Sequence, residues 1–176
     1  MGEGKSITML NLAISFAETG QKVLLIDADL RRPALARLLV ERAAPGLSNV
    51  LAGLCSVDEA IHPGLYPNLD VLFSGDIPPN PSELLSSDRM HEIVDEMAEK
   101  YDYILVDVPP VNAVADVCII ANKLDGVLYL VRSNKAEKEE VKRGVNQLQM
   151  VGAKLLGFVL NGVEMETYKG YYVEYE

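Results

Sequence analysis

The chain has 176 residues, 49% of them hydrophobic, and a formal net charge of -10 at pH 7. This length and apolar content predict one globular domain with a substantial core, and the acidic balance argues against a surface that wraps nucleic acid. No run of about 18 apolar residues is present to cross a bilayer and no signal-peptide pattern opens the chain, so we expect a cytoplasmic protein. The cysteines and histidines stand alone in the sequence, without the spacing of metal ligands, so we expect a reduced protein in which they bind no metal; they are Cys55, Cys118, His62 and His91.

The N-terminal segment carries a phosphate-binding pattern, Gly2, Glu3, Gly4, Lys5 and Ser6. Glycines allow the turn, the lysine reaches terminal phosphates and the hydroxyl helps to hold Mg²⁺. Apolar residues at helical spacing follow, so the loop is expected to open a helix over residues 5–18, whose N-terminus favours anions. The full pattern has an earlier glycine, which would precede the first residue, so we expect the chain to begin inside the motif. The alternative is a flexible, polar N-terminus.

A continuously apolar run over residues 23–26 is typical of a strand buried on both faces of a parallel sheet. Asp27 ends this run. If the chain stays extended for two more residues, Asp27 and Asp29 point to the same side, because side chains alternate along a strand. The two carboxylates would then either cap the strand end or coordinate Mg²⁺ and position an attacking hydroxyl.

The rest of the chain alternates between strand and helix signals. We expect strands over residues 68–73, 104–106, 127–131 and 155–160. One helix is expected to begin at a capping box over residues 56–59, and two others are expected over 82–100, with a break near 86–87, and over 135–151. Residues 75–81 are expected to form a proline-rich loop. This order predicts an α/β fold, a mostly parallel β-sheet sandwiched by helices that right-handed crossovers connect.

Polar residues follow several of the expected strands. Asp107 ends one apolar run and Asn161 ends the last. Because ligands of open α/β sheets bind beyond the carboxyl ends of the strands, we expect Asp27 and Asp107 to meet over one metal-bound triphosphate near Lys5. The Asn161 amide either reads an adenine edge or initiates a turn.

The C-terminal segment concentrates half of the eight tyrosines in nine residues, at Tyr168, Tyr171, Tyr172 and Tyr175. We therefore divide the chain into a nucleotide-binding domain over residues 1–163 and a tyrosine-rich tail over residues 164–176. The tail is either a sticky edge strand or interface anchor, or a mobile substrate whose hydroxyls enter a neighbouring active site.

Taken together, these segments resemble the bacterial protein tyrosine kinases that control capsular and exopolysaccharide synthesis, a branch of the deviant P-loop ATPases. The resemblance covers essentially the whole chain. It is carried by residues 2–6, 23–33, 78–85 and 101–110 and by the tyrosine tail.

The resemblance implies a role for each of these positions. Asp27 would help to bind Mg²⁺ and activate the incoming tyrosine, while Asp107 would act on the metal through water. The implied catalytic residues are Lys5, Asp27, Asp29 and Asp107; the nucleotide-binding residues are Gly2, Glu3, Gly4, Lys5, Ser6, Ile7 and Asn161; the Mg²⁺ ligands are Ser6, Asp27 and Asp107; and the phosphoacceptors are Tyr168, Tyr171, Tyr172 and Tyr175.

The chain departs from the family pattern at two places. Ile7 stands where the family usually has a second hydroxyl, although its backbone N-H can still donate. The family also keeps a central strand, and often an oligomer-forming helix, before the phosphate loop. We therefore expect this chain to bind ATP more weakly than a version extended upstream, which a titration with Mg·ATP would measure.

The resemblance also implies cofactors and partners. ATP and Mg²⁺ would serve a kinase that phosphorylates its own C-terminal tyrosines and regulates polysaccharide synthesis and export. Expected partners are a membrane-bound polysaccharide co-polymerase that activates the kinase and recruits it to the inner face of the cell membrane, a cognate phosphatase, other tyrosine-containing substrates and further copies of the chain. Phosphorylation of four tyrosines would add roughly -6 to -8 charges, which should drive the copies apart.

Two other classes of protein stay open at this point. One is a nucleotide-driven switch like the cell-division and DNA-partition ATPases, which share the three motifs without kinase activity. The other is a non-catalytic assembly subunit of a polysaccharide export complex. Tyrosine phosphorylation in the presence of ATP separates all three.

Overall fold

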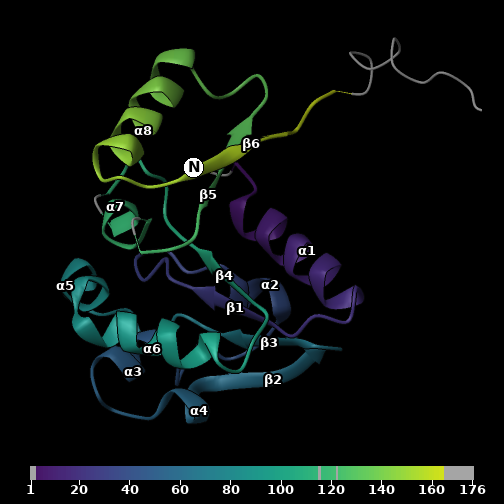
Figure 1. Cartoon of the computed structure of the whole chain (residues 1–176), viewed down its shortest axis with the longest axis vertical. Helices are drawn as coiled ribbons and strands as arrows, with labels where there is room; N and C mark the ends of the chain where they lie inside the picture. Colours follow the sequence, from purple (N-terminus) through teal and green to yellow (C-terminus); the bar gives the residue numbers. More distant parts are fainter. Residues whose placement is uncertain (1–2, 115, 122, 165–176) are drawn as a thin grey trace, which may run out of the picture.

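A computed structural model describes residues 3–114, 116–121 and 123–164. Its larger sheet has four strands in the order β2 (Ile61–Tyr66), β3 (Leu69–Leu72), β1 (Val23–Asp27) and β4 (Tyr103–Asp107) (Figure 1). β1 runs parallel to both β3 and β4, and β2 adds an antiparallel edge. The predicted α/β class with a mostly parallel sheet is confirmed, although β2 had not been expected as a strand.

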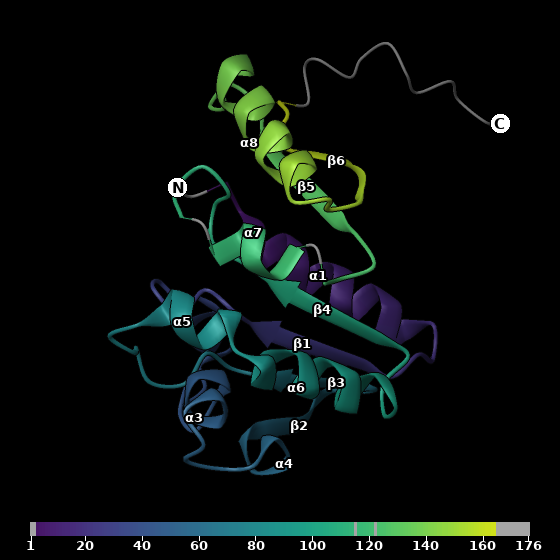
Figure 2. The same cartoon turned by 60° about the vertical axis from the view of Figure 1, so that its left-hand side comes forward.

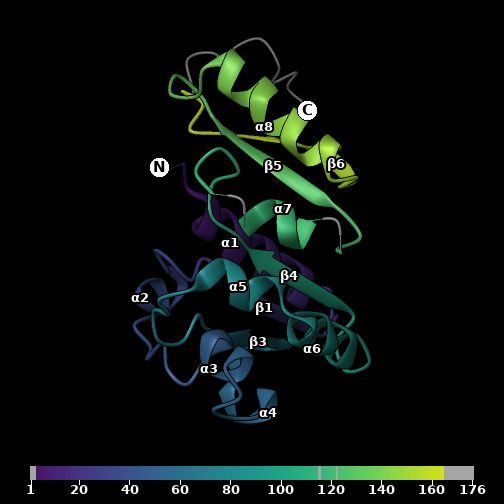
Figure 3. The same ribbon diagram turned by 90° about the vertical axis from the view of Figure 1, so that its left-hand side faces the viewer.

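A second sheet consists of β5 (Val127–Arg132) and β6 (Leu155–Asn161), which run parallel. Within the described residues no hydrogen-bonded ladder joins β4 to β5, so the strands form two sheets. Helix α7 (Asp116–Ala121) lies between them, as Figures 2 and 3 show from two sides. Ile120 packs with the core of the larger sheet, while Val117 packs beneath the smaller one. Helix α7 therefore couples the two sheets through side chains.

The other helices flank the two sheets. They are α1 (Lys5–Glu18), α2 (Leu35–Leu39), α3 (Leu47–Leu51), α4 (Val57–Ala60), α5 (Pro81–Ser86), α6 (Asp88–Ala98) and α8 (Lys138–Met150). The break expected near residues 86–87 is confirmed, since α5 ends at Ser86 and α6 begins at Asp88. The capping box is also confirmed, because Glu59 N donates to Ser56 Oγ at 3.3 Å and Ser56 N donates to Glu59 Oε2 at 2.8 Å.

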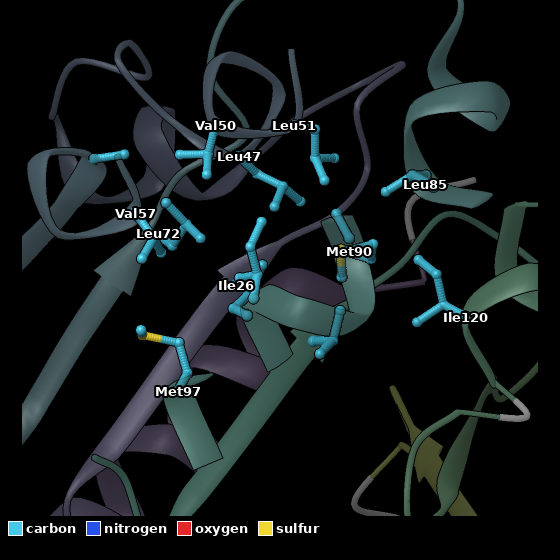
Figure 4. Packing of buried hydrophobic residues seen from close by; sticks show 14 of the residues in the cluster. Ile26, Leu47, Val50, Leu51, Val57, Leu72, Leu85, Met90, Met97 and Ile120 are labelled. Atoms are coloured by element: carbon cyan, nitrogen blue, oxygen red, sulfur yellow. The ribbon is translucent and has the colours of Figure 1, made fainter. Parts of the chain in front are cut away.

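The core lies on both faces of β1, all of whose residues are buried. Leu24 and Ile26 face a cluster built by α3 to α6, part of which Figure 4 shows around Ile26, Met90 and Met97. Val23 and Leu25 face a cluster that includes residues of α1. Burial of each such side chain contributes about 1.5–3 kcal/mol, which explains why a short apolar run forms the centre of the sheet.

None of the described helices combines the length and apolar character that crossing a membrane requires. Cys55 and Cys118 are half-buried free thiols.

Candidate nucleotide and metal site

The phosphate loop enters α1 through Gly4, at a position where the backbone conformation favours glycine. Gly4 caps the helix with φ of 90°, in the left-handed region. A Cβ built on Gly4 would lie 2.5 Å from Nδ2 of Asn161, so the Asn161 amide would have to move to make room for any other residue at this position. Beyond Gly4, the first N-H groups of α1 have no acceptor within the helix, which makes this end of the helix suitable for binding an anion. Gly2 lies outside the described residues.

Asn161 at the end of β6 holds this loop in place. Its Nδ2 donates to the Glu3 carbonyl oxygen at 2.8 Å, and its Oδ1 accepts from Gly162 N at 2.8 Å. The hydrogen bond to Glu3 anchors the phosphate loop, a role that the sequence did not suggest. The hydrogen bond from Gly162 matches the alternative in which Asn161 initiates a turn. Adenine recognition by Asn161 stays a prediction.

Asp27 and Asp107 lie side by side where β1 and β4 end. They are partners in the parallel register, and Ala28 N donates to the Asp107 carbonyl oxygen at 2.8 Å. Their residues are 0% and 3% exposed. Two carboxylates some eighty positions apart in the sequence therefore share one edge of the sheet, which is the arrangement that the sequence predicted.

The loop after β1 wraps around the Asp27 carboxylate. Oδ1 accepts from Asp29 N at 3.2 Å, while Oδ2 accepts from Ala34 N at 3.2 Å and Leu35 N at 3.1 Å. Burial raises the pKa of Asp27 from 3.8 to about 6; the backbone donors oppose the rise and the nearby Asp107 charge adds to it. Asp27 is thus a fixed, desolvated carboxylate that an approaching cation would stabilise in its charged form.

Helix α1 brings Lys5 and Ser6 to Asp107. Burial raises the pKa of Asp107, the Ser6 hydroxyl that hydrogen-bonds to it and the Lys5 ammonium lower it, and the Asp29 charge raises it. The structure therefore brings together five residues that the sequence selected, Lys5, Ser6, Asp27, Asp29 and Asp107.

The position of Asp29 differs from the extended geometry considered above. β1 ends at Asp27, and Asp29 lies in the following loop, where its Oδ1 accepts from Arg32 N at 2.9 Å. Strand alternation therefore does not set its direction. The Asp27 carboxylate holds the loop in its turn, because it accepts hydrogen bonds from Asp29 N near the beginning of the loop and from Ala34 N and Leu35 N near its end. No local sequence pattern indicates these contacts.

Ile7 lies in the first turn of α1 and is 53% exposed. Its side chain is aliphatic and has no polar group, so its expected contribution to nucleotide binding is a hydrogen bond from its backbone N-H. The predicted phosphoacceptors Tyr168, Tyr171, Tyr172 and Tyr175 all lie outside the described residues.

The donor set fits Mg²⁺ with a bound nucleotide. In the described ranges, no group of three or more histidine, cysteine, aspartate or glutamate side chains is arranged to hold a metal by itself. Mg²⁺ usually keeps several waters and binds one or two carboxylates together with substrate phosphates. Two carboxylates and a hydroxyl, from Asp27, Asp107 and Ser6, match that preference.

Sequence reasoning missed a polar cluster next to the site. Arg31 Nε donates to Oδ2 of the buried Asp116 at 2.7 Å, and Ser82 Oγ donates to Asp116 Oδ1 at 2.6 Å. Arg31 and Ser82 each fell within a segment selected for its family resemblance, but Asp116 carried no signal of its own. Because Arg31 and Asp116 are 85 positions apart, only the fold reveals the pair.

Comparison with known proteins identifies the family. A family model described as "AAA domain" matches residues 1–153. Tyrosine-protein kinase YwqD of Bacillus subtilis (strain 168) is 44% identical over 173 residues, which cover 97% of this chain and 73% of YwqD. The chain belongs to the bacterial tyrosine-protein kinases. It spans only 22% of the length of two other relatives of this kinase family, both named EpsB, from Ralstonia.

Solved structures place the fold in the same family. The kinase domain of Escherichia coli tyrosine kinase ETK matches with a TM-score of 0.89 and 35% identity, over 99% of this chain and 67% of that chain. The septum site-determining protein MinD from Pyrococcus horikoshii OT3, complexed with Mg-ADP, matches with a TM-score of 0.73 and 26% identity, over 90% of this chain and 65% of that chain. The tyrosine kinase is thus the more similar of these two structures.

Proposed function

We propose that this chain is the catalytic domain of an ATP-dependent protein tyrosine kinase that phosphorylates its own C-terminal tyrosine cluster. Through this activity it would regulate capsular or exopolysaccharide synthesis and export. The observation that supports the proposal most directly is the pair of buried carboxylates, Asp27 and Asp107, beside Lys5 and Ser6 of the phosphate loop.

Each of these residues has a task in binding the donor. The N-terminus of α1 would receive the phosphates of ATP, and the Lys5 ammonium would neutralise charge on the terminal ones. Mg²⁺ would neutralise the charge that develops on the phosphoryl oxygens, held by the Ser6 hydroxyl, Asp27 and, through water, Asp107. MinD, which this chain resembles in fold, is described with Mg-ADP, which supports this choice of ligand.

The reaction would be an in-line transfer to a phenol. The bond between the γ-phosphorus and the β,γ-bridging oxygen breaks, a bond from the phosphorus to the tyrosine oxygen forms, and the phenolic proton moves to the Asp27 carboxylate. A phenol has a pKa of about 10, so base assistance is useful.

The proposed partners follow from the family. Tyrosines 168, 171, 172 and 175 would be the phosphoacceptors, supplied by the chain itself or a second copy, with other proteins as further substrates and a phosphatase to reverse the reaction. A membrane-bound polysaccharide co-polymerase would activate the kinase and recruit it to the inner face of the membrane. The great length of the EpsB relatives beyond the matched region is compatible with such an activator.

A nucleotide-driven switch is the second candidate, favoured by the 26% identity with MinD. It would use the same phosphate loop and carboxylates but would transfer phosphate only to water. The two functions differ in one product, phosphotyrosine.

The decisive experiment is mass spectrometry of residues 164–176 after incubation with ATP and Mg²⁺. We expect phosphate on one or more tail tyrosines of the wild type and a loss of at least 100-fold in Lys5→Met. Lys100→Met is the matched control, because Lys100 forms exposed ion pairs with Asp58 and Glu96 remote from the phosphate loop. ATP hydrolysis without phosphotyrosine, also after addition of a membrane activator from a YwqD-like system, would favour the switch.

A further inference from the structure

Three polar side chains join three separate segments beside the carboxylate pair. Arg31, in the loop after β1, donates from Nε to Asp116 Oδ2 at 2.7 Å and from a terminal nitrogen to Asp116 Oδ1 at 3.3 Å. The same terminal nitrogen donates to Ser82 Oγ at 2.8 Å, and Ser82 donates to Asp116 Oδ1 at 2.6 Å. We call Arg31, Ser82 and Asp116 the loop anchor.

The loop anchor fixes the start of α5 and the start of α7 to the segment that follows Asp27. Ser82 is the second residue of α5 and Asp116 is the first residue of α7. The anchored segment is the one whose backbone N-H groups, from Asp29, Ala34 and Leu35, bind both oxygens of the Asp27 carboxylate. Arg31 thus lies between the donors that hold Oδ1 and those that hold Oδ2.

From this geometry we infer that Arg31 is a positioning residue, which acts through its loop to orient the Asp27 carboxylate toward the Mg²⁺ of the bound nucleotide. The inference rests on the proposed function, because it concerns the same metal site. No sequence pattern assigned a role to Arg31, and its contact with Asp116 explains why a carboxylate is charged inside the protein.

The energetics favour a specific requirement for arginine. Asp116 is 1% exposed, and a buried carboxylate without its partner is costly. Although burial raises the pKa of Asp116, the Arg31 guanidinium and the Ser82 hydroxyl hold it below its ordinary value. The planar guanidinium contacts both Asp116 oxygens and the Ser82 hydroxyl together, whereas a lysine ammonium would offer one point charge.

The test compares ADP binding with and without Mg²⁺, by calorimetry on the full chain. ADP alone reports on the phosphate loop, and the gain in affinity on adding Mg²⁺ reports on the carboxylates. Outer partners that orient metal ligands typically change metal affinity by about 10- to 100-fold. We expect Arg31→Met to reduce the Mg²⁺-dependent gain by about tenfold or more while ADP affinity without Mg²⁺ stays within about twofold.

Conservative variants separate positioning from folding. Arg31→Lys should recover part of the gain and Ser82→Ala should lose only about two- to threefold, because each keeps part of the loop anchor. These variants also carry the test if Arg31→Met fails to fold by circular dichroism. Arg89→Met is the matched control: the Arg89 side chain is 40% exposed, as is that of Arg31, but its partner is Glu92 in a surface pair on α6.

The outcomes distinguish this inference from the function on which it rests. A wild type whose ADP affinity does not respond to Mg²⁺ would overturn the proposed metal site. A wild-type response that survives in Arg31→Met, or an equal loss of ADP affinity with and without Mg²⁺, would overturn the positioning role alone. In turnover measurements, the same loss of Mg²⁺-dependent affinity predicts a rise in KM for Mg·ATP in Arg31→Met and a partial return in Arg31→Lys.

Discussion

The four-stranded sheet and the β5–β6 pair are built from similar apolar runs, but they differ in how far those runs are buried. Every residue of β1 is buried, whereas Leu156, Phe158 and Leu160 of β6 are 58%, 56% and 58% exposed. β1 has a hydrogen-bonded strand on each side and an apolar cluster on each face, while β6 pairs, among the described strands, with β5. An apolar run thus shows that a strand can be buried, and its neighbours decide whether it is.

This difference matters for the site, because the site draws on both regions. Asp27 and Asp107 end strands of the well-packed sheet, which fixes their separation through hydrogen bonds of the ladder. Asn161 belongs to the less buried pair and reaches across to the Glu3 carbonyl of the phosphate loop. We therefore expect the carboxylates to be held more rigidly than the loop contact from β6.

The largest effect is expected on the free energy of unfolding, when one leucine from each sheet is replaced by alanine. Leu25→Ala removes a side chain that is 0% exposed, and it should lower the free energy of unfolding by about 2–5 kcal/mol. Leu160→Ala, at 58% exposure, should cost less than about 1 kcal/mol. Urea denaturation of both variants measures the difference. Equal losses would mean that β6 is covered in solution and would remove the contrast between the two sheets.

We expect the stability of the protein to depend on pH through Asp27, at the end of β1 in the four-stranded sheet. The folded pKa of Asp27, about 6, lies above its ordinary 3.8, so the folded state holds the proton more tightly than the unfolded state. The contribution of this group is fully present below pH 3.8 and is lost as the pH rises through 6, which amounts to about 3 kcal/mol. Unfolding free energies between pH 4 and 7.5 would show this decline.

Asp27→Asn is the control for this pH dependence. The amide does not titrate, so the variant should show a flatter profile over the same range, whatever its absolute stability. The general repulsion of a chain with a net charge of -10 also increases with pH, and it is present in both proteins. Parallel profiles for wild type and variant would show that the decline comes from elsewhere.

The smallest expected effect concerns the contact between β6 and the phosphate loop. Gly4 and Gly20 both have left-handed backbones, with φ of 90° and 86°, but only at Gly4 would a Cβ meet another atom within 4 Å, the Asn161 amide. Alanine at Gly20 should cost about 1 kcal/mol from conformation alone. Alanine at Gly4 should add a further 1 kcal/mol or so and weaken nucleotide binding, because the amide must move.

Calorimetric ADP titration together with thermal unfolding would separate the two costs. The comparison isolates the close approach of Asn161, since the conformational penalty is common to both glycines. If Gly4→Ala and Gly20→Ala lose the same stability and neither changes ADP binding, the contact of β6 with the loop has no influence on the site.

Much of the fold and part of the site could be predicted from local patterns. The apolar run before Asp27, the helix that follows Lys5 and the capping box at Ser56 each depend on neighbouring residues, so each appears in the sequence. The division into two sheets could not be predicted in this way. The apolar runs of β5 and β6 predict strands buried in a parallel sheet. Whether they join the larger sheet depends on whether the edge of β4 pairs with that of β5, and in the described residues it does not.

The sequence alone determined which residue types are available for phosphate and metal chemistry, and that buried strands end at Asp27 and Asp107. Only the tertiary structure decided that these carboxylates are register partners, that the Asp29 loop turns back to bind Asp27, and that Arg31 meets the buried Asp116. The physical reason is range. Helix periodicity, strand alternation and capping act over a few residues, whereas ladder pairing, desolvation and ion pairs join residues that the chain has brought together from about eighty positions apart.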